Sequence, residues 1–186
     1  MTEEDRLEKT LLDIARRARL AARELARLPS RQKDEALRSI ADGLRTQIKT
    51  ILQRNRTDVE KAKEAGLPVA AVDRLTLTGD RIEAIAAGIE EIANLPDPVG
   101  EVTKMWKRPN GLRIGKVRVP IGVIGFIYES RPNVTVDAAG LCLKSGNAII
   151  LRGGSEAIES NSAIADVVAD SLGKAGLPRD GVQLLR

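Results

Sequence analysis

Four consecutive residues offer the clearest chemistry in this sequence: Arg152, Gly153, Gly154 and Ser155. They follow the apolar run AIIL and precede a segment with helical spacing. An arginine at the carboxyl end of a parallel strand is suited to bidentate phosphate binding, and a serine can donate to a ribose or phosphate oxygen. The alternative is a plain turn that carries a surface arginine. From spacing alone, both interpretations stay open.

A second group of polar residues, Ser130, Arg131 and Asn133, follows the apolar run IGVIGFIY. Pro132 suits the first turn of a helix, whose amides would face an oxyanion or a carboxylate. Arg131 would add a charge there and Asn133 an amide, although a helix cap with an exposed arginine is the alternative. This turn contains no glycine, so the G-x-G-x-x-G fingerprint is absent and the standard Rossmann cofactor pose is disfavoured.

The remaining composition excludes several kinds of catalysis. The 186 residues include no histidine, which removes Ser-His-Asp and Cys-His catalysis and histidine-type zinc sites from within the chain. The single cysteine, Cys142, lies in an apolar helical stretch without flanking positive charge, so we predict a buried structural thiol and no metal site. A lone cysteine and the lack of a signal peptide or membrane-length apolar run favour a cytoplasmic protein.

The first hundred residues are predicted to be helical. Apolar positions at helical spacing predict a helix over residues 3–28 and a second one from Ser30, its N-cap, to a stop at Gly66. A third helix is expected after Thr78. No catalytic constellation is found in this part of the chain.

Residues 105–120 break this pattern and read as a β-hairpin. Asn110-Gly111 is a strong hairpin-turn signal between two runs that alternate in polarity, with an irregularity expected near Gly115. From Lys104 to Arg118 there are six basic residues and no acidic one. Such an extended basic arm could pair with another subunit or lie on nucleic acid.

From Ile121 onward the pattern is β-α-β-α-β, which places the chain in the α/β class. The first strand, IGVIGFIY, is continuously apolar and is predicted to be buried on both faces of a parallel sheet. Helices 133–147 and 155–178 and strands AIIL and GVQLL complete the pattern. Open α/β sheets normally have five or more strands, so a three-stranded sheet predicts the front portion of a longer protein.

Residues 118–164 resemble a known enzyme family, and the resemblance is most specific in three motifs, YESRPNVTVDAA, CLKSGNA and LRGGSEA. They are similar to the γ-glutamyl phosphate reductases, also called glutamate-5-semialdehyde dehydrogenases, in the aldehyde dehydrogenase superfamily. The resemblance covers essentially the whole chain. It implies a helical part of the cofactor-binding domain at 1–100, a hairpin arm for oligomerisation at 101–120, and the first half of a Rossmann-like NADP-binding sheet at 121–186.

The resemblance also implies a reaction. In this family NADPH reduces L-glutamyl 5-phosphate to L-glutamate 5-semialdehyde, with release of phosphate, after a cysteine thiolate attacks the acyl phosphate. That cysteine lies in a later domain, and Cys142 does not match it, so the chain is expected to contain no catalytic residue and to be inactive alone. Arg152 takes the place of a superfamily lysine near the adenosine ribose. Ser155 takes the place of a glutamate common in NAD-preferring relatives, which favours NADP.

One departure concerns the oxyanion site. The superfamily places an asparagine in a Trp-Asn motif after the first strand, whereas this chain has ESRPN, so Ser130, Arg131 and Asn133 all remain candidates. The implied partners are a small-molecule substrate, a second copy bound through the 105–120 hairpin and a transient glutamate 5-kinase contact, with no nucleic acid and no membrane. The alternatives are another acylating aldehyde dehydrogenase of the CoA-thioester type, or a non-catalytic domain that binds nucleic acid through the basic arm.

Overall fold

The computed structural model describes residues 2–129 and 131–186. Its N-terminal part is helical, as predicted, and Thr78 caps its helix by accepting a hydrogen bond from the Arg81 amide at 3.2 Å. Gly66 has a φ of 72°, the left-handed conformation expected of a glycine that ends a helix. The helices of this part are α1 (Glu3–Leu25), α2 (Ser30–Thr46), α3 (Ile48–Glu64), α4 (Val69–Leu75) and α5 (Gly79–Asn94).

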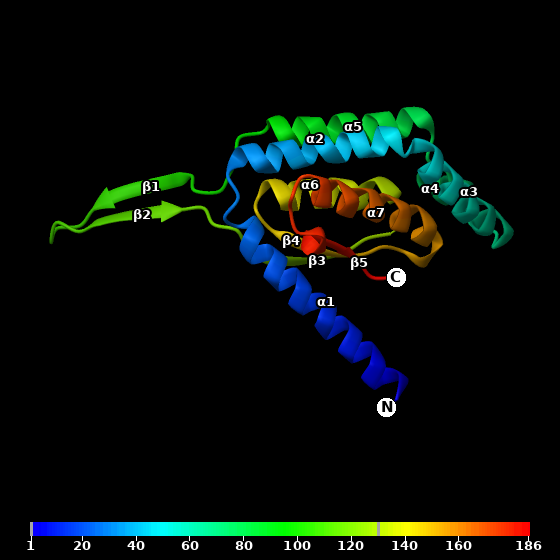
Figure 1. The fold of residues 1–186 in the computed structure, drawn as a ribbon, viewed down its shortest axis with the longest axis horizontal. Coiled ribbons are helices and arrows are strands. Elements are labelled where there is room, and N and C mark those ends of the chain that lie inside the picture. The colour runs from blue at the N-terminus through cyan, green and yellow to red at the C-terminus, as the bar shows by residue number, and fades with distance from the viewer. Residues whose placement is uncertain (1, 130) are drawn as a thin grey trace.

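Three details of this helical part differ from the prediction. The predicted second helix is two helices, because Gln47 leaves the helical dihedrals at φ −98° and ψ 14°. Before the bend α2 packs against both α5 and α7, and beyond it α3 packs chiefly against α7 (Figure 1). Ser30 is not the N-cap of α2: Pro29 occupies that position, and the Ser30 hydroxyl donates to Asp97 at 2.7 Å instead. Helix α4 was missed.

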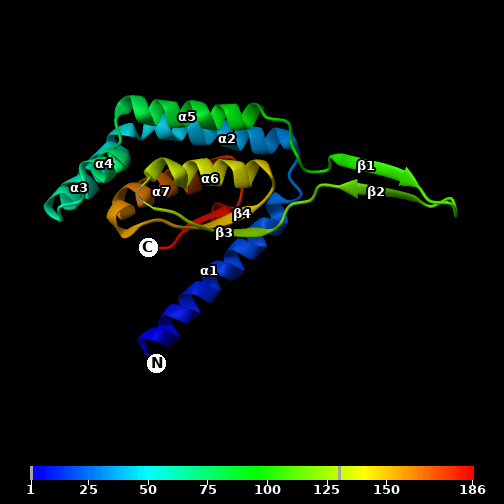
Figure 2. The same cartoon turned by 180° about the vertical axis from the view of Figure 1, so that it is seen from behind.

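The hairpin arm is confirmed. Strands β1 (Val102–Lys107) and β2 (Arg113–Val117) pair in antiparallel register, with Gly111 at φ 88° in the connection. The irregularity lies in β1, between Val102 and Lys104, whereas Gly115 pairs regularly with Met105. Figures 1 and 2 show the arm projecting from one end of the body.

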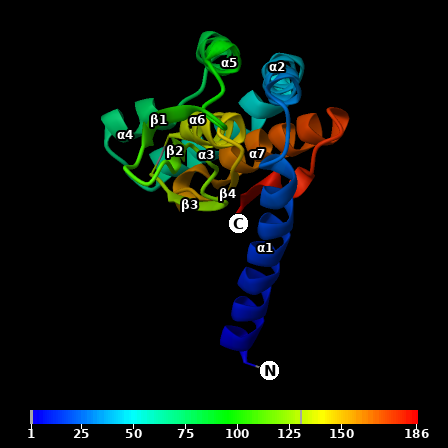
Figure 3. The same cartoon turned by 90° about the vertical axis from the view of Figure 1, so that its left-hand side faces the viewer.

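The C-terminal part is a three-stranded parallel sheet in the order β3-β4-β5. Helices α6 and α7 lie on one face beneath the α2–α5 layer, and α1 crosses the other face (Figures 1 and 3). The predicted α/β class, with N-terminal helices, a hairpin arm and a parallel sheet, is therefore confirmed. Its elements are β3 (Val123–Ile127), α6 (Pro132–Lys144), β4 (Ala148–Arg152), a short 3-10 turn (Ser155–Ala157), α7 (Ile158–Lys174), a second 3-10 turn (Arg179–Gly181) and β5 (Val182–Leu184).

The prediction that the first strand is buried on both faces is wrong. Strand β3 is at the edge of this sheet, and Ile127 is 81% exposed. Its exposure follows from the position of α1, which packs chiefly under β4 and leaves much of β3 uncovered. The buried-strand pattern holds for the central strand β4, whose Ile149 and Leu151 are fully buried.

Small residues let the helical layers approach one another closely. A Cβ atom at Gly140 of α6 would lie 2.8 Å from Ile89 Cδ1 of α5. Ala86 and Ala139, from the same two helices, are fully buried. With few aromatic side chains available, close packing of alanine, leucine and isoleucine builds the core.

Candidate cofactor site

The turn after β4 places Arg152 and Ser155 in solvent. Arg152 is the last residue of β4, and its carbonyl accepts a hydrogen bond from the Tyr128 amide at 3.0 Å, which extends the pairing of β3 with β4. Within the described residues, the Arg152 guanidinium makes no hydrogen bond or ion pair, so it is available to an anion. Arg152, Gly153 and Ser155 border a cavity of about 700 Å³ that α1 closes on the other side.

The two glycines of this turn have different surroundings. A Cβ atom at Gly153 would lie 2.2 Å from Asn161 Nδ2 and 3.0 Å from Tyr128 Cζ, both on buried side chains. The atoms nearest to a Cβ atom at Gly154 would all belong to the carboxylate of Glu156, the end of a flexible side chain. Gly153 is therefore required by the protein's own packing, whatever binds outside.

A chain of buried polar groups lies beneath Gly153. The Tyr128 hydroxyl is 2.6 Å from Thr135 Oγ1, which donates to Asn161 Oδ1 at 3.0 Å. This chain joins the end of β3 to the first turns of α6 and α7. Burial raises the pKa of Tyr128 above its usual value. Asn161 Nδ2 has no partner among the described residues, although the side chain is fully buried.

Sequence reasoning missed this polar chain. Thr135 and Asn161 are polar residues on helix faces that are otherwise apolar, and that pattern is the signal that could have drawn attention to them. It would not have shown that the two side chains meet.

The start of α7 is capped by a carboxylate from another helix. Asp58 of α3 accepts hydrogen bonds from the amide of Ser160 at 2.7 Å, its hydroxyl at 2.6 Å and the amide of Glu159 at 3.3 Å. Asn55, also on α3, donates to the Ser160 hydroxyl at 3.0 Å. Burial raises the pKa of Asp58, and the hydrogen bonds from Ser160 oppose that shift. Two first-turn amides of α7 are thus occupied by the protein itself.

The second predicted group lies at the start of α6. Pro132 is the first residue of that helix, as expected, and the Arg131 side chain is exposed. Asn133 Nδ2 donates to Asp137 Oδ2 at 3.0 Å, and burial raises the pKa of Asp137 above its usual value. Ser130 lies outside the described residues.

The sheet brings the two groups to the same edge. Strands β3 and β4 are parallel, so the turn at Arg131 and the turn at Arg152 both follow carboxyl ends. Ligands of open α/β sheets bind at such edges. Within the described residues, however, Arg131 and Asn133 do not line the cavity beside Arg152.

The comparisons with known proteins agree on one family. No protein-family model matches the chain. The gamma-glutamyl phosphate reductase of Desulfatibacillum aliphaticivorans is 52% identical over 179 residues, which are 96% of this chain and 43% of the relative. That of Moorella thermoacetica is 58% identical over 169 residues, 91% of this chain and 40% of the relative. This chain is homologous to the N-terminal part of the gamma-glutamyl phosphate reductases.

Solved structures support the same assignment. The gamma-glutamyl phosphate reductase of Thermotoga maritima aligns with a TM-score of 0.91 at 47% identity, over 94% of this chain and 42% of that one. The Saccharomyces cerevisiae enzyme aligns with a TM-score of 0.87 at 35% identity, over 93% and 45%. A salicylaldehyde dehydrogenase from Pseudomonas putida, at 20% identity and a TM-score of 0.69 over 95% and 34%, shares the fold. The chain spans 40–43% of the length of the curated relatives that it matches.

Within this reductase homologue, Cys142 is an unsuitable nucleophile. It is 7% exposed, and burial raises the pKa of its thiol to about 11. It lies near the C-terminal end of α6, whereas the candidate groups follow the carboxyl ends of β3 and β4. The prediction of a buried cysteine is confirmed.

Across residues 2–129 and 131–186, no three histidine, cysteine, aspartate or glutamate side chains are grouped so as to hold a metal ion. None of the helices in those ranges combines the length and apolar character needed to span a bilayer.

Proposed function

We propose that this chain is the NADP-binding N-terminal portion of a γ-glutamyl phosphate reductase. The intact enzyme would use NADPH to reduce L-glutamyl 5-phosphate to L-glutamate 5-semialdehyde, with release of phosphate, as a step of proline biosynthesis in the cytoplasm. The observation that carries the proposal is 52–58% identity to such reductases over more than nine tenths of the chain. The same identity favours this function over a CoA-thioester dehydrogenase or a nucleic-acid-binding domain.

The residues present fit the anionic end of the cofactor. Arg152 offers an exposed guanidinium beside a cavity, without an ion-pair partner among residues 2–129 and 131–186, and Ser155 is exposed three residues further along the chain. We assign Arg152 to the 2′-phosphate of NADP and Ser155 to an oxygen of the same ribose, with Gly153 and Gly154 forming the turn between them. When bound, the cofactor would supply the hydride. The residues of this chain would hold its adenosine end, and Arg131 or Asn133 would face the substrate side.

In the proposed reaction a cysteine thiolate attacks the acyl phosphate, and Cys142 does not provide that thiolate. A thiol with a pKa near 11 is almost entirely protonated at neutral pH. The chain by itself is therefore proposed to be inactive. Turnover of glutamyl phosphate by the purified 186-residue protein would contradict this proposal.

We further propose that residues 101–120 form an arm for self-association, with residues 1–100 and 121–186 as the two parts of the cofactor-binding domain. The arm exposes apolar side chains, among them Met105 at 64% and Val119 at 75%. Glutamate 5-kinase is the proposed transient partner, because it would supply a labile acyl phosphate.

The cofactor assignment is tested by titrating the protein with NADPH and NADH. Arg152→Ala should weaken NADPH binding by about tenfold or more and leave NADH binding nearly unchanged, because a charge-assisted bond to phosphate contributes about 1.5–3 kcal/mol. Arg56→Ala, an exposed arginine on α3, is the matched control. Equal weakening of both cofactors, or of neither, would reject the role of Arg152.

A further inference from the structure

The arm is joined to the body through two stems, one entering at 97–101 and one leaving at 118–122. Its strands pack chiefly on each other and extend away from the helical layers (Figures 1 and 2). The stems are tied to one another near the body. The Gly100 amide donates to the Arg118 carbonyl at 2.9 Å, and the Arg118 amide donates to the Glu101 carbonyl at 3.0 Å. The direction of the arm therefore depends on how the stems are fixed to the body.

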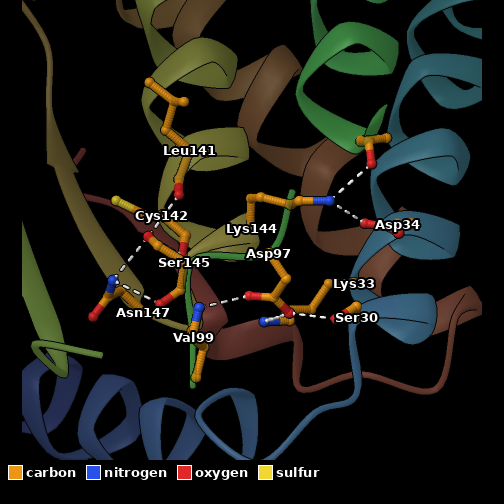
Figure 4. A network of polar contacts seen from close by, with 11 residues as sticks. Ser30, Lys33, Asp34, Asp97, Val99, Leu141, Cys142, Lys144, Ser145 and Asn147 are labelled. Carbon is orange, nitrogen blue, oxygen red and sulfur yellow. Dashed lines mark hydrogen bonds and ion pairs between the residues drawn. The ribbon is translucent and has the colours of Figure 1, made fainter. Parts of the chain in front are cut away.

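The entering stem is fixed to the first turn of α2. The carboxylate of Asp97 forms an ion pair with Lys33 and accepts a hydrogen bond from Ser30 Oγ at 2.7 Å (Figure 4). Its other oxygen accepts from the amide of Val99 at 2.9 Å. Lys33 is 2% exposed, so this charge has been moved almost completely out of water. Burial raises the pKa of Asp97, but the bonds from Lys33, Ser30 and Val99 outweigh it, and the pKa is lowered.

The leaving stem is fixed to the turn between α6 and β4. The amide of Gly122 donates to Asn147 Oδ1 at 2.8 Å. Asn147 is itself held by Ser145, whose hydroxyl and carbonyl accept from Asn147 Nδ2 at 2.9 Å and 3.2 Å. Pro120 packs on the same turn, because a Cβ atom at Gly146 would lie 3.0 Å from its Cγ.

A second buried lysine connects the two attachments. Lys144, at the end of α6, is 4% exposed and donates to Asp34 of α2 at 2.5 Å and to the Ala93 carbonyl of α5 at 2.8 Å. Asp34 is the neighbour of Lys33 in the chain. The first turn of α2 thus binds the entering stem directly, and through Lys144 it binds the helix end that precedes Asn147 (Figure 4).

We propose that these groups form an arm clamp that sets the direction of the β1–β2 arm for contact with a second copy of this chain. The arm clamp consists of Ser30, Lys33, Asp34, Asp97, Lys144 and Asn147. Apolar contacts would attach the stems equally well but would permit several orientations, whereas ion pairs and hydrogen bonds fix one. Buried ion pairs commonly add little net stability, and fixing geometry is one reason to retain them. The choice of partner rests on the self-association proposed above.

The test measures the direction of the arm itself. In a Cys142→Ala background, spin labels on Asn110→Cys at the arm tip and Glu91→Cys on α5 report one distance by pulsed electron paramagnetic resonance. The unmodified clamp should give a single narrow distribution. The double variant Lys33→Met/Asp97→Leu removes both charges together, so that neither is left unpaired, and should at least double the width of that distribution while the helical circular dichroism is unchanged.

Two further variants keep the test decisive. Arg31→Met/Glu35→Gln removes an exposed ion pair of the same helix and should leave the distribution unchanged. Lys144→Met/Asp34→Leu is the second clamp variant and replaces the first one if that protein does not fold. An unchanged mean and width in a folded clamp variant would overturn the proposal.

Sedimentation of the same proteins separates the clamp from the proposed self-association. Weaker self-association together with a broadened distribution supports the whole inference. A broadened distribution with unchanged self-association would overturn the assignment of a second copy as the partner. If the unmodified chain stays monomeric, the proposed self-association is refuted. The distance distributions of the clamp variants would still show whether the arm clamp sets the direction of the arm.

Discussion

Gly153→Ala provides the sharpest test of how the turn after β4 is built. The added Cβ would lie 2.2 Å from Asn161 Nδ2, 3.0 Å from Tyr128 Cζ and 3.1 Å from the Tyr128 hydroxyl oxygen. Both side chains are buried and linked through Thr135, so neither can move without disturbing the polar chain. Overpacking of this kind costs about 1–3 kcal/mol. Each kcal/mol lowers the melting temperature of a chain of this size by about 2–4 °C.

The matched control is Gly154→Ala in the next position. Gly154 has a φ of −63°, which any residue adopts, and the atoms nearest to its added Cβ belong to the Glu156 carboxylate. Loss of chain entropy in the unfolded state favours such a change by about 0.4–1 kcal/mol, which offsets part of the cost of moving Glu156. Thermal unfolding followed by circular dichroism should therefore rank Gly153→Ala clearly below Gly154→Ala.

A double variant without the Asn161 side chain tests whether overpacking causes the loss of stability in Gly153→Ala. Asn161→Ala removes the side chain nearest to the added Cβ, so Gly153→Ala should lower the free energy of unfolding less in that background than in the unmodified protein. Coupling between residues in contact is commonly about 0.5–3 kcal/mol. If Gly153→Ala melts at the same temperature as Gly154→Ala, or if its cost is the same with and without Asn161, the packing explanation is refuted.

Two further predictions concern titratable groups. Cys142 should react with a thiol reagent at pH 8 at least tenfold more slowly in the folded protein than in urea, because its pKa is about 11; equal rates would contradict its burial. Asp97→Asn should cost about 3 kcal/mol at pH 7, because it leaves Lys33 buried without a counter-charge. Since the folded-state pKa of Asp97 lies below its usual 3.8, this contribution is present above that pH and is lost as the pH falls through the folded-state pKa. The free energies of unfolding of the unmodified protein and of Asp97→Asn, measured by denaturant titration, should converge at low pH. A difference that does not change with pH would contradict the ion pair.

Local signals predicted most of the fold because their causes are local. Gly66, Gly146 and Gly176 all adopt a φ of 72° at helix ends, a conformation without steric cost for glycine because it lacks a Cβ. The Asn-Gly pair placed the hairpin turn for the same reason. The failures have non-local causes. Gln47 is neither glycine nor proline, and the helix breaks where the packing on α5 ends, because α2 packs on both α5 and α7 whereas α3 packs chiefly on α7. Ser30 finds Asp97, which lies 67 residues further along the chain.

The candidate site shows the same division. The positions of Arg152 and Ser155 followed from the order of strands and helices, since a turn after a parallel strand must lie at the carboxyl edge of the sheet. The reason for Gly153 did not follow, because Asn161 reaches it from α7 and Tyr128 from the residue after β3. A glycine beside a suspected nucleotide site invites the interpretation that a ligand comes close. Here a buried amide of the protein occupies the space that a side chain would need.

The cap on α7 has a consequence for how an anion can bind at this edge. In a glycine-fingerprint site, the free amides at a helix start hold the pyrophosphate. Here the carboxylate of Asp58 takes the amides of Glu159 and Ser160, and a phosphate placed there would meet a negative charge as well as occupied donors. Those two amides are therefore not available to an anionic group, and the proposed binding of the cofactor relies on the Arg152 side chain. Under the proposed assignment of Arg152 to the 2′-phosphate, which NADPH carries and NADH lacks, substituting that one residue should be enough to separate the two cofactors.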